Sequence, residues 1–293
     1  MGPNEINPHG PELILYRGAE AKIIDGLGEF KFSLHSRDDI WVSDVLRKGL
    51  VFERHIYFLL REFLGSEDCF LDIGANIGWF TVIGSRLVGD RGLVLAVEPD
   101  PFNLRLLKRN LRLNGCYNVE VFPLALSDRP GKATLYRSSN NQGDHQLAVH
   151  SDRPDHVRVR VIAVDELLQR WLQKIDFIKI DTQGSEAAIL RGMSELLQRP
   201  KRIRMVLEFW PQGLENCGAS VEALVASLGR FGGRYWLLHW DNTTEPVEPY
   251  QLVDLGRGRY APASGAHTDI VRADPGDEAV IGYLAALERG PAP

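Results

Sequence analysis

The stretch of residues 69–80 constrains the fold of this chain more than any other. Residues 70–73 predict a short buried strand, and the residues after Gly78 have helical character. The turn between them contains Gly74 and Asn76 and carries little side-chain bulk. Free backbone N–H groups at the start of a helix, beside small residues, let a ligand approach closely. The stretch therefore predicts a ligand-binding turn at the end of a buried strand.

An acidic residue follows the next predicted strand. Residues 93–97 are apolar and predict a strand that ends at Glu98-Pro99. Glu98 comes twenty residues after Gly78, and an acid at this place can accept hydrogen bonds from both hydroxyls of a ribose. The turn and the acid together indicate a cofactor that contains a nucleoside.

The pattern of the turn bears on which cofactor binds. A dinucleotide-binding turn has the pattern G-x-G-x-x-G, which lets the backbone contact a pyrophosphate. Here the pattern is Asp72-x-Gly74-x-Asn76-x-Gly78. A carboxylate beside the turn repels a pyrophosphate but attracts the amino group of an amino-acid moiety. The turn therefore favours S-adenosylmethionine over NAD, and a nicotinamide-dependent oxidoreductase remains the alternative.

Composition excludes several classes of protein. The 293 residues are 44% hydrophobic and 25% charged, as in ordinary globular proteins. A net charge of −5 argues against a nucleic-acid binder that relies on a basic surface. The three cysteines are scattered and form no C-x-x-C pair, which fits a reducing cytosol. No apolar run approaches membrane-spanning length. We therefore expect a cytoplasmic protein with no nucleic-acid or membrane partner, and a homo-oligomer remains open.

We expect three parts along the chain. Residues 1–66 form an N-terminal extension, residues 67–275 the cofactor-binding core, and residues 276–293 a C-terminal helix and tail. The extension has three predicted strands and two predicted helices, which cover residues 13–16, 22–24, 30–34, 38–47 and 53–64.

The core alternates between predicted strands and helices. This alternation predicts an α/β fold, in which helices cover both faces of a mostly parallel sheet. Near residues 130–163 the alternation breaks, and an antiparallel insertion with strands at 132–137, 146–150 and 157–161 is predicted. Residues 234–240 and 270–271 predict a final hairpin with a loop over 241–268.

Acidic residues stand at or just after the ends of the core strands. In an open α/β sheet the ligand binds beyond the carboxyl ends of the strands, so these acids are predicted to surround one site. The alternative is that each one is a helix cap or a turn residue. They are Asp72, Glu98, Asp128, Asp181 and Glu208.

Lys179 is unusual because it lies inside an apolar strand, two residues before Asp181. Side chains alternate along a strand, so these two residues share a face. A buried lysine is costly unless it is paired. We predict that Lys179 pairs with a neighbouring acid, and the alternative is that it contacts the substrate.

Several motifs, in order, resemble those of the FkbM-type methyltransferases over about residues 38–209. The resemblance implies a Rossmann-like class I methyltransferase fold with a seven-stranded sheet. It also implies methyl transfer from S-adenosylmethionine to oxygen, usually on a sugar or a natural product. The motifs are Leu71-Asp-Ile-Gly-Ala-Asn-Ile-Gly78, Val97-Glu-Pro-Asp-Pro101, Asn110-Leu111, Leu113-Asn-Gly115, Ala125-Leu-Ser-Asp128 and Lys179-Ile-Asp-Thr-Gln-Gly-Ser-Glu186.

The resemblance also implies roles for single residues. The turn from Asp72 to Gly78 holds the methionine part of the cofactor, and Glu98 binds the ribose. Asp128 and its neighbours lie near the adenine, and Asp181 faces the methyl donor and the substrate. Gln183 departs from the family, which often has glutamate there, so a base or metal ligand at that position cannot act in the same way here. The implied cofactor-binding residues are Asp72, Gly74, Ala75, Asn76, Gly78, Glu98, Pro99, Ala125, Leu126, Asp128 and Asp181.

Methyl transfer to an alcohol needs a base, because an alcohol is a poor nucleophile at neutral pH. Asp181 and Glu208 are the leading candidates because their strands are predicted to be neighbours, and His145 is the third. A Mg²⁺ ion held by Asp181, Glu208 and Asn140 is an alternative. No ligand spacing requires it, so we predict no metal.

The expected acceptor is a small hydroxylated molecule, such as a sugar, a glycoside or a polyketide-like compound. Candidate substrate-binding residues are Glu53, Asn140, Lys179 and Trp210. A protein that binds S-adenosylmethionine without catalysis is the other class of function. The acids at the strand ends favour an enzyme, because a binding protein needs no base.

Overall fold

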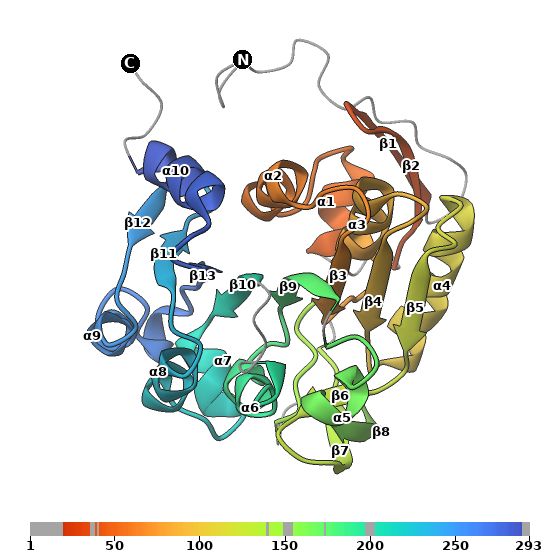
Figure 1. Ribbon diagram of the computed structural model, residues 1–293. Helices are drawn as coiled ribbons and strands as arrows, with labels where there is room; N and C mark the ends of the chain where they lie inside the picture. Colours follow the sequence, from red (N-terminus) through yellow and green to blue (C-terminus); the bar gives the residue numbers. More distant parts are fainter. Residues whose placement is uncertain are drawn as a thin grey trace.

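The computed structural model describes residues 20–35, 39, 41–138, 141–148, 155–172, 174–196 and 203–288. Its centre is an eight-stranded sheet with the order β12-β11-β13-β10-β9-β3-β4-β5 (Figure 1). The strands are β3 (Cys69–Ile73), β4 (Leu93–Val97), β5 (Val119–Phe122), β9 (Ile175–Ile180), β10 (Arg204–Phe209), β11 (Arg234–Leu238), β12 (Thr244–Pro246) and β13 (Thr268–Ala273).

The sheet is parallel at its centre and antiparallel at one side. Strands β5, β4, β3, β9 and β10 pair in parallel, whereas β13 is antiparallel to both β10 and β11. The chain runs outward from β3 to β5 and then returns to β9 on the other side of β3. Such a reversal of strand order opens a crevice at the carboxyl ends of the strands. The α/β, Rossmann-like fold is confirmed.

Two hydrophobic cores lie on the two faces of this sheet. Helices α2, α3, α4 and α10 pack on one face, and α5, α6, α8 and α9 pack on the other (Figure 1). The helices are α1 (Val42–Arg47), α2 (Arg54–Phe63), α3 (Trp79–Val88), α4 (Pro101–Leu113), α5 (Val164–Leu168), α6 (Glu186–Arg191), α7 (Pro211–Asn216), α8 (Val221–Gly229), α9 (Gln251–Arg257) and α10 (Glu278–Leu287).

The alternation of side chains determines which residues lie under α2. Phe70, Phe177 and Val206 belong to the core on the α2 face. Residues two positions further along each strand share that face. Asp72, Lys179 and Glu208 are those residues, so three charged side chains of neighbouring strands point toward the α2 side of the sheet.

The N-terminal elements pack on the same core. Strands β1 (Glu20–Asp25) and β2 (Gly28–Ser33) form the antiparallel hairpin predicted there. Asn110 of α4 accepts a hydrogen bond from the backbone of Ser33 at 2.6 Å and donates one back at 3.1 Å. The predicted strand over 13–16 lies outside the described residues. Because these elements share a core with the sheet, the division of the chain at residues 66 and 275 stays a prediction.

The insertion is a small second sheet with the order β6-β8-β7. Strands β7 (Gly131–Tyr136) and β8 (His156–Ala163) are antiparallel, as predicted, while β6 (Ala125–Ser127) pairs with β8 in parallel. The predicted strand over 146–150 is wrong in its described part, where only Gln146 forms a single bridge.

Two expectations for the C-terminal part are wrong. The sheet has eight strands rather than seven, because the three-residue strand β12 is added at its edge. Proline is tolerated at the end of β12, because an edge strand has no hydrogen-bonded partner on its outer side. The predicted loop over 241–268 also contains α9 and a 3₁₀ turn at Pro262–Ser264. Elements this short carry too few residues for a recognisable period.

No helix in the described parts of the chain combines the length and the apolar character needed to cross a bilayer.

Candidate functional site

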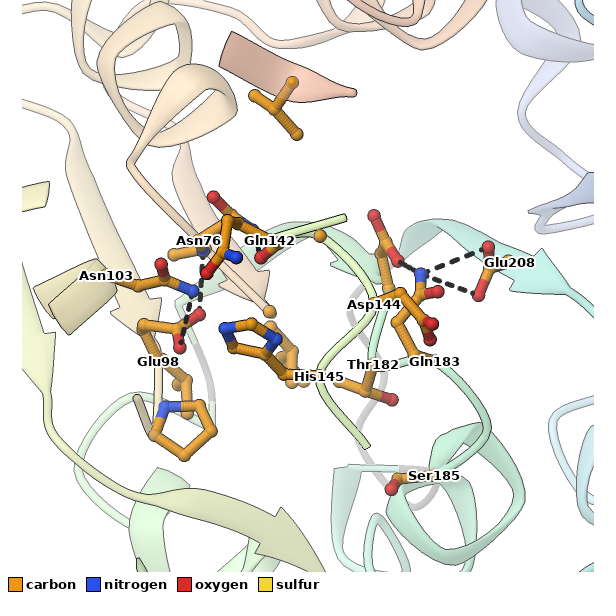
Figure 2. A pocket seen from close by; sticks show the side chains of 18 of the residues that line it. Asn76, Glu98, Asn103, Gln142, Asp144, His145, Thr182, Gln183, Ser185 and Glu208 are labelled. Carbon is orange, nitrogen blue, oxygen red and sulfur yellow. Dashed lines mark hydrogen bonds between the residues drawn. The ribbon is translucent and has the colours of Figure 1, made fainter. Parts of the chain in front are cut away.

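A cavity of about 280 Å³ lies at the carboxyl ends of the central strands, at the crevice that the reversal of strand order predicts. Figure 2 shows it from close by. Most of its wall comes from segments that follow β3, β4, β9 and β10, and the insertion and the start of α2 complete it. The lining residues come from segments 41–42, 52–53, 73–77, 79–80, 97–99, 124–126, 141–145, 179–183 and 208–210 and from positions 103, 135, 147, 185, 189, 265 and 267.

The turn after β3 requires glycine. Gly74 has a φ of +86°, and a Cβ there would lie 1.8 Å from the carbonyl oxygen of Asp181. At Gly78, φ is +90° and a Cβ would lie 2.4 Å from Leu107. Gly74, Ala75 and Asn76 line the cavity, whereas Gly78 does not. The small residues therefore let the turn lie directly against β9 and α4.

Asp72 lies beneath the turn rather than in the cavity wall. It is fully buried, and its Oδ2 accepts a hydrogen bond from Thr81 Oγ1 at 2.6 Å. Burial raises its pKa. Its register neighbour on β9 is Lys179. The predicted contact between Asp72 and the cofactor stays a prediction, and the position of the side chain points to a role through the charge of Lys179.

Glu98 occupies one end of the cavity (Figure 2). Its carboxylate accepts hydrogen bonds from the backbone N–H groups of Asn76 and Asp100, both at 2.8 Å. Burial raises the pKa of Glu98 from 4.5 to about 7, although these two N–H groups lower it. Pro99, Leu124, Ala125 and Leu126 line the cavity as well. The Glu98 end of the cavity therefore combines one carboxyl group with an apolar slot, which these four residues form.

Asp128 does not line the cavity. It accepts a hydrogen bond from Arg191 Nε at 3.1 Å and lies 3.4 Å from Arg129 Nε. Burial opposes ionisation, but these arginines lower the pKa of Asp128 overall. The predicted position of Asp128 near the adenine stays a prediction.

The opposite end of the cavity contains a connected set of polar side chains. Lys179 Nζ donates to Asp181 Oδ2 at 2.9 Å, which confirms the predicted pairing of this lysine with an acid. Gln183 Nε2 donates to Asp181 Oδ1 at 2.7 Å and to the two oxygens of Glu208 at 3.2 and 3.1 Å. Figure 2 shows Gln183 beside Glu208. One amide group thus holds two carboxylates together.

Hydrogen bonds to Glu186 hold the loop after β9 in place. Glu186 is buried and accepts hydrogen bonds from the N–H and Oγ1 of Thr182, at 2.9 and 2.8 Å, and from the N–H of Gly184 at 3.2 Å. Gln183 adopts a left-handed backbone with a φ of 56°. The loop therefore presents the Gln183 side chain to the two carboxylates in one defined conformation.

Burial sets the electrostatics of this end. It raises the pKa of Glu208 well above its usual range, and the nearby Asp181 and Glu186 raise it further. Burial alone would lower the pKa of Lys179, but the carboxylates of Asp181 and Glu53 raise it overall. Lys179 is therefore a fixed cation, while Glu208 is a carboxyl group with a strong affinity for a proton.

Other predicted residues divide between the two ends. Glu53 and Trp210 line the cavity. His145 also lines it, but Figure 2 shows it on the Glu98 side, away from Gln183 and Glu208. The structure therefore does not bring His145 together with the two acids that were predicted to share its role. Asn140 lies outside the described residues.

Sequence reasoning missed several residues of the site. Gln183 was noted only as a departure from a family pattern, and nothing in the sequence indicated that its amide bridges two strands. Gln142 accepts a hydrogen bond from Asn76 Nδ2 at 2.9 Å, which joins the insertion to the turn. His55 of α2 is buried and lies 2.7 Å from Asp269, the register neighbour of Glu208. Among these residues, only Gln142 lies in a segment that the sequence marks as unusual, the polar run 138–144.

Two of the donors named for a metal, Asp181 and Glu208, lie together, and the third, Asn140, is outside the described residues. Within the part of the chain that the structure describes, no group of three or more His, Cys, Asp or Glu side chains is arranged to hold a metal ion. The carboxylates of Asp181 and Glu208 instead share the amide of Gln183.

Comparison with known proteins identifies relatives. "Methyltransferase 1" of Beauveria bassiana is 27% identical over 150 residues, 44% of this chain and 60% of that protein. "Methyltransferase sdnD" of Sordaria araneosa is 28% identical over 212 residues, 61% of this chain and 79% of that protein. "Hexuronic acid methyltransferase AglP" of Haloferax volcanii is 29% identical over 173 residues, 57% of this chain and 66% of that protein. The chain thus spans only part of each relative.

Residues 72–232 match the family described as the Methyltransferase FkbM domain. The matched segment begins at the acid before the glycine turn and includes Glu98, Asp181, Gln183 and Glu208. It covers more than half of the chain, and this chain therefore belongs to the FkbM methyltransferase family.

Proposed function

We propose that this protein transfers the methyl group of S-adenosylmethionine to a hydroxyl oxygen of a small molecule, either a sugar or a natural product. One observation carries the proposal: a single cavity has Glu98 at one end and the pair Asp181 and Glu208 at the other. The first end suits a nucleoside. The second suits a cationic methyl donor and the alcohol that receives the methyl group.

In the proposed complex, the ribose hydroxyls donate hydrogen bonds to Glu98, and the adenine occupies the apolar slot beside Leu126. The methionine part follows the turn from Gly74 to Asn76. The sulfonium lies toward Asp181, whose negative charge attracts it. The segment that matches the family contains all of these residues.

The reaction is an in-line displacement. The acceptor oxygen attacks the methyl carbon, the C–O bond forms while the C–S bond breaks, and the electron pair of the C–S bond stays on sulfur. S-adenosylhomocysteine, a neutral thioether, leaves. The protein has to hold the oxygen and the methyl carbon about 3 Å apart and in line with sulfur, and a base has to take the hydroxyl proton.

We assign the base to Glu208 rather than to Asp181. Both oxygens of Asp181 accept hydrogen bonds from fixed donors, Lys179 and Gln183, so Asp181 acts as a fixed negative charge. Burial raises the affinity of Glu208 for a proton. Because an opposite charge favours the ionised form, bound S-adenosylmethionine prepares Glu208 to accept the proton.

The names of the relatives suggest the acceptor class. The Haloferax protein is named for a hexuronic acid, which is a hydroxylated sugar derivative. A cavity with several carboxylates and indole rings in its wall fits a polyhydroxylated ring, because carboxylates accept hydrogen bonds from hydroxyls and aromatic faces pack on rings.

Calorimetry with S-adenosylmethionine, S-adenosylhomocysteine and NAD tests the cofactor. We expect the first two to bind and NAD not to bind; tight binding of NAD alone would refute the proposal. Formation of S-adenosylhomocysteine is then followed with a panel of sugars, glycosides and polyketide alcohols, and mass spectrometry detects the methylated product. Cofactor binding without turnover of any acceptor would favour a non-catalytic binding protein instead.

A further inference from the structure

Three non-glycine residues with a left-handed backbone lie on the wall of the cavity. Their φ values are 45° at Glu53, 50° at Asn76 and 56° at Gln183. Such conformations are strained for residues with a side chain, and they cluster at functional sites. The side chains of Asn76 and Gln183 have a visible task, since they bond to Gln142 and to the two carboxylates. Glu53 needs a separate explanation.

The structure gives Glu53 no structural task of its own. It precedes the first residue of α2 in the N-cap position, yet its side chain makes no capping hydrogen bond. Its Oε2 atom is inaccessible to solvent, and no hydrogen-bond partner for this atom exists among the residues that the structure describes. A buried polar atom without a partner destabilises the folded state, and more strongly when it is charged. A ligand group that binds Glu53 would recover this cost.

The surroundings of Glu53 determine the charge of that ligand group. Burial raises the pKa of Glu53, and the nearby Asp181 raises it further, while Lys179 lowers it. Among the described residues that line the cavity, Lys179 is the one lysine or arginine, and it already binds Asp181 at 2.9 Å. With Glu208 also present, this end has more carboxylates than cations. Lys179 is already paired, so a further anion would find no cation here, whereas an added cation would favour the ionised forms of Glu53 and Glu208.

Aromatic side chains complete this part of the wall. Trp210 directly follows β10, and His267 directly precedes β13, the strand that pairs with β10. Phe80 lies under the Lys179 ammonium at 4.9 Å. Aromatic faces attract ammonium groups and pack on rings, so the walls and the charge favour the same ligand.

Resting on the proposed function, we propose that Glu53 is a specificity-determining residue that binds an ammonium group of the acceptor. The protein then methylates a hydroxyl of an amine-bearing ring compound and discriminates against ring compounds that carry a carboxylate. This preference is opposite in charge to that suggested by the name of the hexuronic acid methyltransferase of Haloferax.

Three probes with the same ring test the proposal: trans-4-aminocyclohexanol, trans-1,4-cyclohexanediol and trans-4-hydroxycyclohexanecarboxylate. Their dissociation constants are measured by ligand-observed NMR on protein saturated with S-adenosylhomocysteine. The variant is Glu53→Gln. The matched control is Glu67→Gln, because Glu67 also has a left-handed backbone, with a φ of 73°, but pairs with Arg91 at the surface away from the cavity. Melting temperatures establish that both variants fold.

We expect the unchanged protein and the Glu67→Gln control to bind the amine at least tenfold more tightly than the carboxylate, which corresponds to about 1.4 kcal/mol. In Glu53→Gln this ratio falls at least threefold. Equal affinities, the reverse order, no binding of any probe, or a ratio unchanged in Glu53→Gln would overturn the assignment. Failure to bind S-adenosylhomocysteine in the first place would count against the proposed function instead.

Discussion

Replacing Glu98 with glutamine tests the cofactor end of the cavity through two separate quantities. The first is stability. A carboxyl group whose pKa rises from 4.5 to about 7 on folding binds its proton more tightly in the folded state. The free energy of unfolding therefore decreases as the pH rises from 4.5 to 7, by about 3 kcal/mol at about 1.4 kcal/mol per pH unit. Glutamine cannot ionise, so this loss disappears in Glu98→Gln.

The second quantity is the affinity for S-adenosylhomocysteine. The ribose hydroxyls favour the ionised form of Glu98, so the affinity of the unchanged protein should rise with pH up to about 7, by at most tenfold per unit. Glutamine offers one acceptor oxygen in place of two. Hydrogen bonds to a charged group contribute about 1.5–3 kcal/mol, so Glu98→Gln should weaken binding by roughly 10- to 100-fold at pH 8.

Urea unfolding at pH 5 and pH 8, and calorimetric titration between pH 6 and pH 8, measure the two effects. The matched control is Glu120→Gln, which changes an exposed glutamate on the neighbouring strand β5. We expect Glu98→Gln without cofactor to be more stable than the unchanged protein at pH 8 and similar to it at pH 5. The reasoning would be refuted if Glu98→Gln bound S-adenosylhomocysteine as tightly as the unchanged protein, or if the affinity of the unchanged protein did not change with pH.

Three further substitutions address the rest of the site. Glu208→Gln should lower the turnover of an accepted alcohol by about 10²-fold or more with cofactor affinity within threefold in calorimetry; full turnover would remove Glu208 as the base. Gln183→Glu places a third carboxylate between Asp181 and Glu208, which raises the pKa of Glu208 and should move the acidic limb of the pH–rate profile to higher pH; an unmoved limb would contradict the bridge. Gly74→Ala places a Cβ 1.8 Å from a backbone oxygen and should lower the melting temperature and abolish cofactor binding. The control is Gly131→Ala, whose Cβ would meet nothing within 4 Å, and it should leave both quantities unchanged.

The cofactor end could be predicted from the sequence because its information is local. Gly74 and Gly78 follow β3, and Glu98 follows the adjoining strand β4, within one strand–helix–strand unit. The glycine pattern and the position of the acid both follow from that unit. The position of Asp181 followed from the same rule about strand ends. The rule does not hold for every acid, since Asp128 also follows a strand but lies outside the cavity wall and binds Arg191.

The acceptor end could not be predicted in the same way. The amide of Gln183 joins Asp181 to Glu208 only because β9 and β10 are neighbours and the loop between β9 and α6 adopts one conformation. Glu53 was named as a candidate, but its buried and unbonded oxygen depends on where α2 packs. Contacts between segments far apart in the chain leave no periodic signal in the sequence.

The insertion that contains Gln142 has a consequence for how this protein can diversify. The backbone of Gln142 binds both Asn76 in the glycine turn and Asp39 in the N-terminal part, so one loop joins the glycine turn to the N-terminal part. At the acceptor end, Asp181 and Glu208 belong to the ends of the central strands β9 and β10, whereas Glu53 comes from a peripheral segment, the N-terminal part of the chain. Exchange of the peripheral segments between relatives is therefore a route to new substrates that leaves the methyl supply in place.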